Sequence, residues 1–296
     1  MDGYGPFITG SMNVTLTGAY GTMTGAVVVY PANGTTHRWD LPPNRTNAPY
    51  PAFTCTHGLG GTALDWRNSG LAIKMASWGF VVFLPQFDFS VQVPDEIAAW
   101  HSAALDWLVT KNATHGDTLE GMVLTSSFGA MGHSRGGRIV IAAAENDTRY
   151  AAVVPIAPAN FSYSVPEKLI VPVQYEVGTL DPFVPQTYAL YNRSSAPKYL
   201  IIINGMTHSV KGVLGDIALT YGLSFFEYYI AHNYSWLGWV YGDNVQQDTR
   251  IVFIYEIPTV IEHVAGIFAI AGCVALCFSI AKQKRKKKVR TVTSCR

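Results

Sequence analysis

Charged residues are scarce in this chain and nearly balanced. Lys, Arg, Asp and Glu make up 14% of its 296 residues, with 21 basic against 20 acidic side chains. A net charge of +1 provides no general attraction for polyanions, so we expect no nucleic-acid partner. Apolar residues, by contrast, account for 49% of the chain, enough for one large domain with a substantial core.

Cysteine is also too scarce to build a disulfide framework. Cys55 lies in an apolar run and is expected to be a buried small hydrophobe. Cys273 lies in a long apolar segment, and Cys277 and Cys295, near its end and beyond it, are candidates for S-acylation. There is no Cys/His cluster with metal-ligand spacing, so we predict neither a metal site nor a cofactor.

A long uncharged run occurs near the end of the chain. Residues 264–281 read VAGIFAIAGCVALCFSIA, and such a helix would be about 27 Å long, close to the thickness of a bilayer core. We predict a transmembrane helix over 258–281 and a basic cytoplasmic tail over 282–296. The tail contains these basic residues: Lys282, Lys284, Arg285, Lys286, Lys287, Lys288, Arg290 and Arg296.

The asparagine residues indicate on which side of the membrane the domain before this apolar run lies. Eight Asn residues begin an N-x-Ser/Thr sequon, namely Asn13, Asn33, Asn44, Asn112, Asn146, Asn160, Asn192 and Asn233. The sequons and the positive-inside rule both favour an extracellular or lumenal domain with a cytoplasmic tail. The opening MDGYGPFITG has no signal-peptide pattern. Three explanations are open: a signal peptide has been removed, the natural start site is a different one, or the protein is tail-anchored with a cytosolic domain.

Short β-rich runs alternate with helical patterns through the first 240 residues. This alternation predicts a mostly parallel sheet with helices on both faces, of the α/β-hydrolase type, over 1–240, and a stalk over 241–257. The expected strands are Gly25–Tyr30, Ala52–Thr56, Phe80–Leu84, Phe128–Met131, Ala151–Ile156, Val171–Glu176 and Lys198–Ile203. The expected helices are Ala63–Ser77, Glu96–Thr110, Arg135–Glu145, Pro185–Asn192 and Val210–His232.

The sequence GHSRGG, residues 132–137, fits the G-x-S-x-G pattern of a nucleophile elbow. It follows an expected strand and opens an expected helix, which is the strand–turn–helix context that the elbow requires. Small residues must flank the serine because its backbone conformation is strained, and Gly132 and Gly136 meet that need. We therefore predict Ser134 as a catalytic nucleophile.

A serine nucleophile needs a base and an orienting acid, which follow it in the order acid, then histidine, in this fold. His208 lies in a loop directly after an apolar strand, where such a fold places its base, unlike His232 and His263. Asp181 lies past the end of the preceding strand and is the expected acid. Glu176 is the alternative.

An oxyanion hole needs two backbone N–H groups aimed at the developing negative charge. The residue after the nucleophile, Arg135, would supply one. The loop His57–Gly61 follows an early strand and precedes a helix, and Leu59 in this loop is the expected source of the second.

The segments HGLGG, ASWGFVVFLPQ, GHSRGG, IAPANF, GTLDPFVP and NGMTHS carry a family resemblance in order and spacing. From about residue 4 to 235 the chain resembles the dienelactone-hydrolase-related lipases, above all the cutinase-like bacterial polyester hydrolases. GHSRGG also resembles the lipase motif of plant chlorophyllases. The resemblance implies the same triad and oxyanion hole, with Gly58, His133, Ala159 and Phe161 as substrate-contacting residues.

This resemblance also has departures. Where polyester-degrading members share two aromatic residues, this chain has Leu59 and Ala159, and Phe161 could partly compensate. Only about 25 residues separate Ile156 from Asp181, too few for a large lid domain, so we expect an open site.

The leading hypothesis is a membrane-anchored esterase that acts on an ester substrate of bulky, lipidic or polymeric type and contacts a lipid bilayer through its C-terminal helix. The alternatives are an acyltransferase or peptidase-like serine hydrolase on the same triad, and a non-catalytic adhesion ectodomain.

Overall fold

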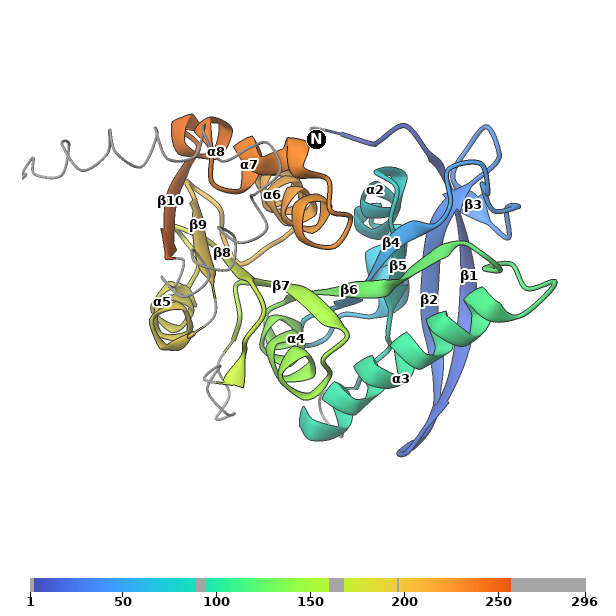
Figure 1. Cartoon of the computed structure of the whole chain (residues 1–296). Helices are drawn as coiled ribbons and strands as arrows, with labels where there is room; N and C mark the ends of the chain where they lie inside the picture. The colour runs from blue at the N-terminus through green and yellow to red at the C-terminus, as the bar shows by residue number, and fades with distance from the viewer. Residues whose placement is uncertain (1–2, 89–93, 160–167, 196, 257–296) are drawn as a thin grey trace, which may run out of the picture. The chain divides into compact units, whose positions relative to one another are not determined.

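The computed structural model describes residues 3–88, 94–159, 168–195 and 197–256 (Figure 1). The strands are β1 (Ile8–Gly18), β2 (Gly21–Ala32), β3 (Arg38–Trp39), β4 (Tyr50–Thr56), β5 (Val81–Leu84), β6 (Val123–His133), β7 (Tyr150–Ile156), β8 (Val173–Gly178), β9 (Lys198–Ile203) and β10 (Ile251–Glu256). The α-helices are α1 (Ala63–Asn68), α2 (Leu71–Ser77), α3 (Pro94–Ala113), α4 (Arg135–Asn146), α5 (Val184–Arg193), α6 (Val213–Tyr229), α7 (Leu237–Val240) and α8 (Asp243–Gln247), with a 3₁₀ turn at Tyr234–Trp236.

Within the described residues, the strands form one mixed sheet in the order β10-β9-β8-β7-β6-β4-β5-β2-β1-β3. The six central strands, from β9 to β5, pair in parallel, whereas β2 and β10 add antiparallel neighbours at the two sides. Figure 1 shows α2 and α6 on one face of the sheet and α3, α4 and α5 on the other. This is the α/β-hydrolase-like architecture that the alternating pattern predicted.

The parallel strands are buried on both faces, which explains their almost continuously apolar sequences. All residues of β5, β8 and β9 are buried. Parallel strands end at the same edge of a sheet, so the loops after β4, β6, β8 and β9 are brought together there. Those four loops contain the residues from which the predicted site is built.

Several boundaries differ from the predicted ones. The expected helix Ala63–Ser77 is divided into α1 and α2, because Gly70 adopts a left-handed φ of 86° between them. The hairpin strand β1 was missed, although Val14 and Leu16 are buried while the residues between and beside them are exposed. The expected helix Val210–His232 is shorter and runs over α6.

The segment after residue 240 also differs from the expected stalk. It contains α8 and β10, and β10 pairs with β9 from Ile251 to Glu256. The compact unit accordingly extends to Glu256. The run IVFIYE is short and follows a polar stretch, and it becomes a strand through its long-range pairing with β9.

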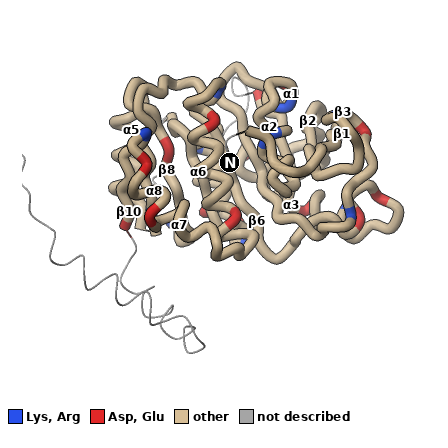
Figure 2. The backbone as a smooth tube through the Cα atoms, turned by 90° about the horizontal axis from the view of Figure 1, so that it is seen from above, with Lys and Arg blue, Asp and Glu red and all other residues tan. Residues whose placement is uncertain are grey.

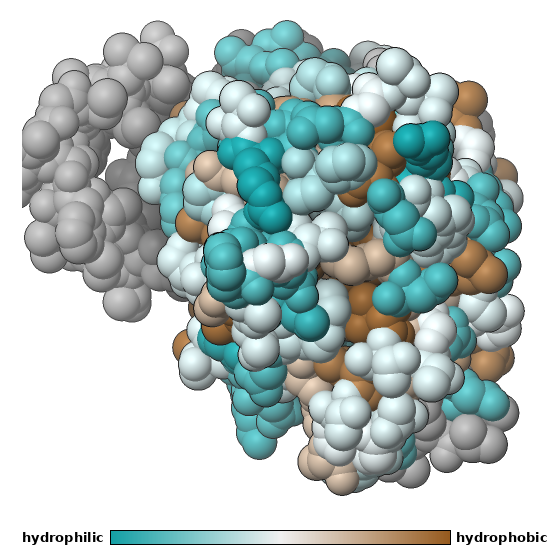
Figure 3. Space-filling model, turned by 90° about the vertical axis from the view of Figure 1, so that its right-hand side faces the viewer, coloured by the Kyte–Doolittle hydropathy of each residue, from teal (hydrophilic) through white to brown (hydrophobic). Residues whose placement is uncertain are grey.

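The predicted membrane helix over 258–281 and the basic tail over 282–296 lie outside the described residues. Among the residues that are described, no helix has the length and apolar character needed to cross a bilayer. Positions of acidic and basic residues are scattered along the backbone of the unit in the view of Figure 2. Figure 3 shows hydrophobic residues interrupted by hydrophilic ones on the face beside β1–β3.

Candidate active site

Ser134 occupies a sharp turn between β6 and α4. Its φ of 57° and ψ of −121° lie in a region that residues with a side chain rarely adopt. A Cβ atom on Gly132 would overlap the carbonyl group of Gly136, and one on Gly136 would overlap that of Thr56. The two glycines are therefore required by close backbone packing, and the turn that they permit projects the serine from the sheet edge.

The three predicted triad residues lie within hydrogen-bonding distance of one another. His208 Nε2 lies 3.0 Å from Ser134 Oγ, and His208 Nδ1 lies 2.9 Å from Asp181 Oδ2. The Asp181 side chain is fully buried, and its Oδ1 accepts the backbone N–H of Phe183 at 2.8 Å. With Nδ1 protonated toward Asp181, the free Nε2 lone pair of His208 faces the serine hydroxyl.

Glu176, the alternative acid, points elsewhere. It lies on β8, its Oε1 accepts a hydrogen bond from Gln174 Nε2 at 2.8 Å, and its carboxyl packs against Gly222 of α6. Complete burial raises the pKa of Glu176 well above its usual range, which favours the neutral acid. Asp181, and not Glu176, is therefore the carboxylate that contacts His208 in this structure.

The other candidates near the triad in sequence lie away from it. His232 is exposed beyond the end of α6 with a φ of 55°, and His263 lies outside the described residues. Asp216 forms an ion pair with Lys74 at 2.9 Å. Neither His232 nor Asp216 contacts Ser134 among the interactions of the described residues.

The loop after β4 passes directly beside the nucleophile. A Cβ atom on Gly58 would lie 3.1 Å from the Cβ of Ser134, so only glycine allows this approach without displacement. The Gly58 carbonyl accepts the N–H of Gly61 at 3.1 Å, which turns the loop tightly. The N–H of Leu59 makes no hydrogen bond within the described part of the chain, and the Leu59 side chain is 61% exposed.

Arg135 is the first residue of α4, so the helix provides no carbonyl four residues earlier for its N–H. The aligned peptide dipoles of α4 make this end of the helix partly positive, next to Ser134. Leu59 and Arg135 thus lie on the two backbone segments that flank the nucleophile, one after β4 and one after β6.

His133, the residue before Ser134, supports the loop that carries His208. Its Nε2 lies 2.7 Å from the backbone carbonyl oxygen of His208, and the two rings are 4.6 Å apart. Burial, assisted by the neighbouring His208, lowers the pKa of His133 to about 4. Neutral His133 with its proton on Nε2 therefore donates to the His208 carbonyl and holds the loop against β6.

A pocket of about 190 Å³ opens over Ser134 and His208. It is lined by Gly58, Leu59, Gly61, Trp66, Leu71, His133, Ser134, His208, Ser209, Val210 and Lys211. Of the expected substrate-contacting residues, Gly58 and His133 line this pocket. Ala159 does not: it is completely buried, and its N–H donates to the Ser134 carbonyl at 3.0 Å. Phe161 lies outside the described residues.

Two aromatic residues at the site were not expected from the sequence. Trp66 of α1 lines the pocket, and the Phe183 ring lies 4.8 Å from the His208 ring. Phe183 follows Asp181 by two residues, so its position in the acid loop was a usable signal. Trp66 had no comparable signal because its place depends on how α1 packs over the sheet edge.

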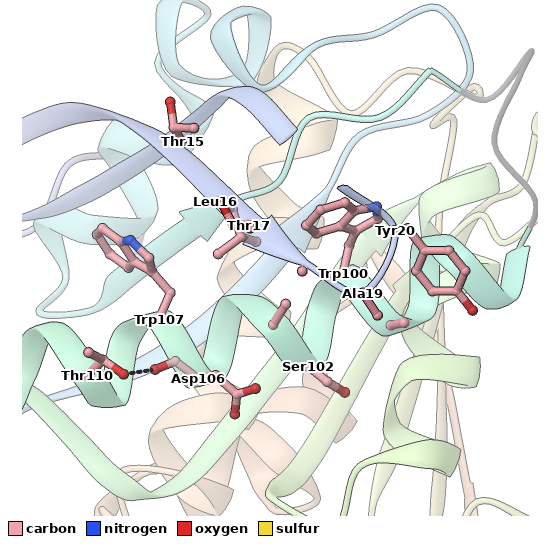
Figure 4. A pocket seen from close by; sticks show the side chains of 13 residues that line it. Thr15, Leu16, Thr17, Ala19, Tyr20, Trp100, Ser102, Asp106, Trp107 and Thr110 are labelled. Carbon is pink, nitrogen blue, oxygen red and sulfur yellow. Dashed lines mark hydrogen bonds between the residues drawn. The ribbon is translucent and has the colours of Figure 1, made fainter. Parts of the chain in front are cut away.

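The chain has a second and larger concavity between the β1–β2 hairpin and α3. It measures about 530 Å³ and has Tyr20, Trp100 and Trp107 among its lining residues (Figure 4). Its one acidic lining residue, Asp106, pairs with Arg149 at 2.6 Å. No nucleophile–base pair lines it. Across the residues that the structure describes, no group of three His, Cys, Asp or Glu side chains could hold a metal ion.

Comparison with known proteins gives relatives whose names describe ester hydrolysis. A bis(hydroxyethyl) terephthalate hydrolase of Streptomyces coelicolor is 27% identical over 177 residues, which is 58% of this chain and 55% of that enzyme. Cutinase 1 of Thermobifida cellulosilytica is 25% identical over 235 residues, covering 76% and 80% of the two chains. A cutinase of Thermobifida fusca has the same identity and covers 76% and 70%.

The chain therefore spans about half the length of the first of these relatives and most of the other two. The family described as PET hydrolase-like matches residues 3–252, nearly all of the unit that contains the sheet. With this match added to the mixed sheet and the serine elbow, the chain belongs to the PET hydrolase-like family, a group of cutinase-like carboxylic ester hydrolases within the α/β-hydrolase superfamily.

Proposed function

We propose that this chain hydrolyses carboxylic esters with Ser134 as nucleophile, His208 as general base and Asp181 as the group that orients the imidazole. One observation carries the proposal. An unbroken line of hydrogen bonds runs from the buried carboxylate through His208 to a serine held at a positive φ. A serine hydroxyl is a weak nucleophile by itself, and this arrangement is what activates it.

The proposed reaction has two halves. Ser134 Oγ attacks the ester carbonyl carbon while His208 Nε2 takes the hydroxyl proton, giving a tetrahedral oxyanion. His208 then returns that proton to the alcohol oxygen as the carbon–oxygen bond breaks, which leaves an acyl group on Ser134. Water, deprotonated by His208, attacks the acyl group, and Ser134 regains its proton as the carboxylic acid leaves.

The oxyanion is assigned to the N–H groups of Leu59 and Arg135. The Leu59 N–H has no competing partner in the described part of the chain, and the Arg135 N–H begins α4. Removal of one such donor typically lowers the turnover number by about 10²–10³-fold. Because both donors are backbone groups, they are tested by changing the turn at Gly58. A Cβ atom added there by substitution would press on Ser134.

The substrate is proposed to be an ester whose alcohol or acyl part extends beyond a small pocket. About 190 Å³ over Ser134 holds only a short group, so a longer substrate continues along the surface. The relatives are named for cutin and for a terephthalate ester. Leu59 and the buried Ala159 provide no aromatic clamp, so the aromatic residues described at this site are Trp66 and Phe183.

The test of the catalytic proposal is covalent labelling. Purified protein is treated with a fluorophosphonate probe and assayed with 4-nitrophenyl acetate and butanoate, beside Ser134→Ala. Labelling and hydrolysis are expected in the wild type and absent in the variant. A wild-type protein that is folded, unlabelled and inactive would leave only the non-catalytic alternative.

We also propose that the domain is held at a membrane by residues 258–281 and lies on the extracellular or lumenal side. Five sequon asparagines, Asn13, Asn33, Asn146, Asn192 and Asn233, are exposed, and Asn44 and Asn112 are half-buried; Asn160 is outside the described residues. Peptide-level glycan mapping of the full chain from eukaryotic cells tests this: glycosylated sequons are expected, and wholly unmodified ones would indicate a cytosolic domain.

A further inference from the structure

The catalytic pocket has a neighbour that shares part of its wall. A second pocket of about 240 Å³ has Tyr4, Ser69 and Lys74 among its lining residues, and it shares Leu71 and Lys211 with the catalytic pocket. Leu71 is 7% exposed, whereas Lys211 is an exposed side chain at the boundary between the two spaces. A substrate bound at Ser134 can therefore reach Lys211 directly and the side pocket beyond it.

Lys211 is the one Lys, Arg, Asp or Glu among the described residues that line the catalytic pocket. The other charges of the side pocket, Lys74 and Asp216, neutralise each other across 2.9 Å. Lys211 has no carboxylate within ion-pair distance in the described part of the chain. The substrate path thus has an uncompensated positive charge beside the catalytic histidine.

The backbone that carries Lys211 is fixed between the catalytic histidine and α6. A Cβ atom on Gly215 would overlap the Val210 carbonyl, so the loop packs closely against the first turn of the helix. Gly212, in the left-handed region at φ 81°, makes the turn into α6. The Ser209 hydroxyl also accepts the Lys211 N–H at 3.2 Å. The backbone of Lys211 is therefore held in place relative to His208, while its side chain is exposed.

The chemistry determines which half of the ester meets this charge. His208 Nε2 must reach the alcohol oxygen to protonate it, so the alcohol half of the substrate lies over His208. The chain continues from His208 through Ser209 and Val210 to Lys211, all of which line the pocket. The alcohol half therefore lies next to the loop that carries Lys211, in the pocket that this residue lines.

We propose that Lys211 is a specificity residue for esters whose alcohol half bears a carboxylate, such as the terminal ester bond of a hydroxy-acid oligomer with a free carboxyl end. This inference rests on the proposed ester hydrolysis at Ser134 and names the substrate class of that site. Such selectivity directs cleavage to the carboxyl end of an oligoester, because the last hydroxy-acid unit combines an alcohol oxygen with an anion.

The test compares two esters that differ in one charge. The substrates are 4-(butanoyloxy)benzoate, with its carboxylate on the alcohol half, and the neutral 4-(butanoyloxy)benzamide. The ratio of their kcat/KM values is measured for the wild type and for Lys211→Gln. An exposed ion pair changes such a ratio by about two- to five-fold, and Lys211→Gln is expected to lower the ratio by that factor. Lys211→Glu should lower it further, and 0.5 M NaCl should lower it in the wild type.

Arg38→Gln is the matched control, because it removes one exposed positive charge from β3, at the far edge of the sheet order from β9. It should leave the ratio unchanged. A ratio that Lys211→Gln leaves at the wild-type value overturns the proposal, and so does an equal fall in both variants. Hydrolysis of the ester bond in the neutral benzamide substrate reports the underlying esterase activity separately. If the wild type hydrolyses neither ester, the proposed function fails and not merely its specificity.

Discussion

The groove beside α3 and the pocket over Ser134 differ sharply in size and in the residues that line them. The groove between the β1–β2 hairpin and α3 encloses about 530 Å³ and is lined with aromatic side chains (Figure 4). The pocket over Ser134 is about a third of that size, at 190 Å³, yet Ser134 and the imidazole-bearing residues His133 and His208 line it. Size alone does not mark the proposed active site here; the convergence of Ser134, His208 and nearby backbone N–H groups does.

The difference follows from where each concavity lies in the sheet. The loops of the small pocket follow β4, β6 and β9, parallel strands whose carboxyl ends meet at one edge. The groove lies beside β1 and β2, which pair antiparallel and are joined by the short turn at Ala19 and Tyr20. An antiparallel hairpin brings no set of independent loops together, so it provides packing surfaces and not a catalytic constellation.

The strongest test of this contrast replaces one serine by alanine in the pocket and one in the groove. Ser134→Ala is expected to lower kcat/KM for 4-nitrophenyl butanoate by about 10⁵-fold or more, because the nucleophile is lost. Ser102→Ala, in the groove, should leave kcat/KM within about two-fold of the wild type. Comparable losses in both variants would show that the groove takes part in catalysis.

A second test separates two carboxyl groups five residues apart. Asp181→Asn should lower kcat by about 10³–10⁴-fold, because an amide cannot hold His208 in the tautomer that accepts the serine proton. Glu176→Gln, which changes a buried acid that faces α6, should keep kcat near the wild-type value. Steady-state kinetics of the two purified variants would assign the acid, and a larger loss in the second would reverse the assignment.

A third test concerns stability. Trp100 is 3% exposed in the groove wall, and Trp100→Ala is expected to lower the free energy of unfolding by about 3–5 kcal/mol through loss of buried surface and the resulting cavity. The folded variant should keep near-normal kcat. Leu59→Ala is the control from the small pocket: its side chain is 61% exposed, and its effect on stability should stay within about 0.5 kcal/mol. Urea denaturation measures both, and equal costs would contradict the division of roles.

The smallest effect is a pH dependence. Because burial raises the pKa of Glu176, the folded chain keeps a proton that the unfolded chain releases as the pH rises above about 4.5. This contribution to stability is complete at low pH and is lost as the pH rises toward the folded-state pKa. Wild type should therefore lose stability relative to Glu176→Gln as the pH rises above about 4.5, the usual pKa of a glutamate side chain. Parallel stability curves for the two proteins would mean that Glu176 is ionised in the fold.

The parallel core was predictable because its strands are short, wholly apolar and separated by helical patterns. Every strand expected from Ala52 to Ile203 is present, and the motif around Ser134 lies between β6 and α4 as expected. The hairpin strand β1 and the late strand β10 were not foreseen. β10 is the last strand in the sheet order, and β1 lies between β2 and the two-residue strand β3; pairing with these partners completes both strands.

The residues of the site also fall into two groups: those that chain order predicts and those that only the packing brings there. The order of Ser134, Asp181 and His208 follows from chain order in this type of sheet, and the structure brings these three within hydrogen-bonding distance. Ala159 had been expected to touch substrate, but its N–H is used beneath Ser134 and its side chain is buried. Trp66 and Lys211 line the pocket only because α1 and the start of α6 pack over the sheet edge.

By itself, the sequence determined the chemical class of this protein. Gly132, Gly136 and the serine between them encode a turn that few other residues could adopt, and the apolar strands encode the sheet that aligns the loops. Only the tertiary structure decided which carboxylate faces His208, that His133 supports the histidine loop, and that Lys211 lies on the boundary of two pockets. Those features depend on distances between segments far apart in the chain, which local residue patterns do not specify.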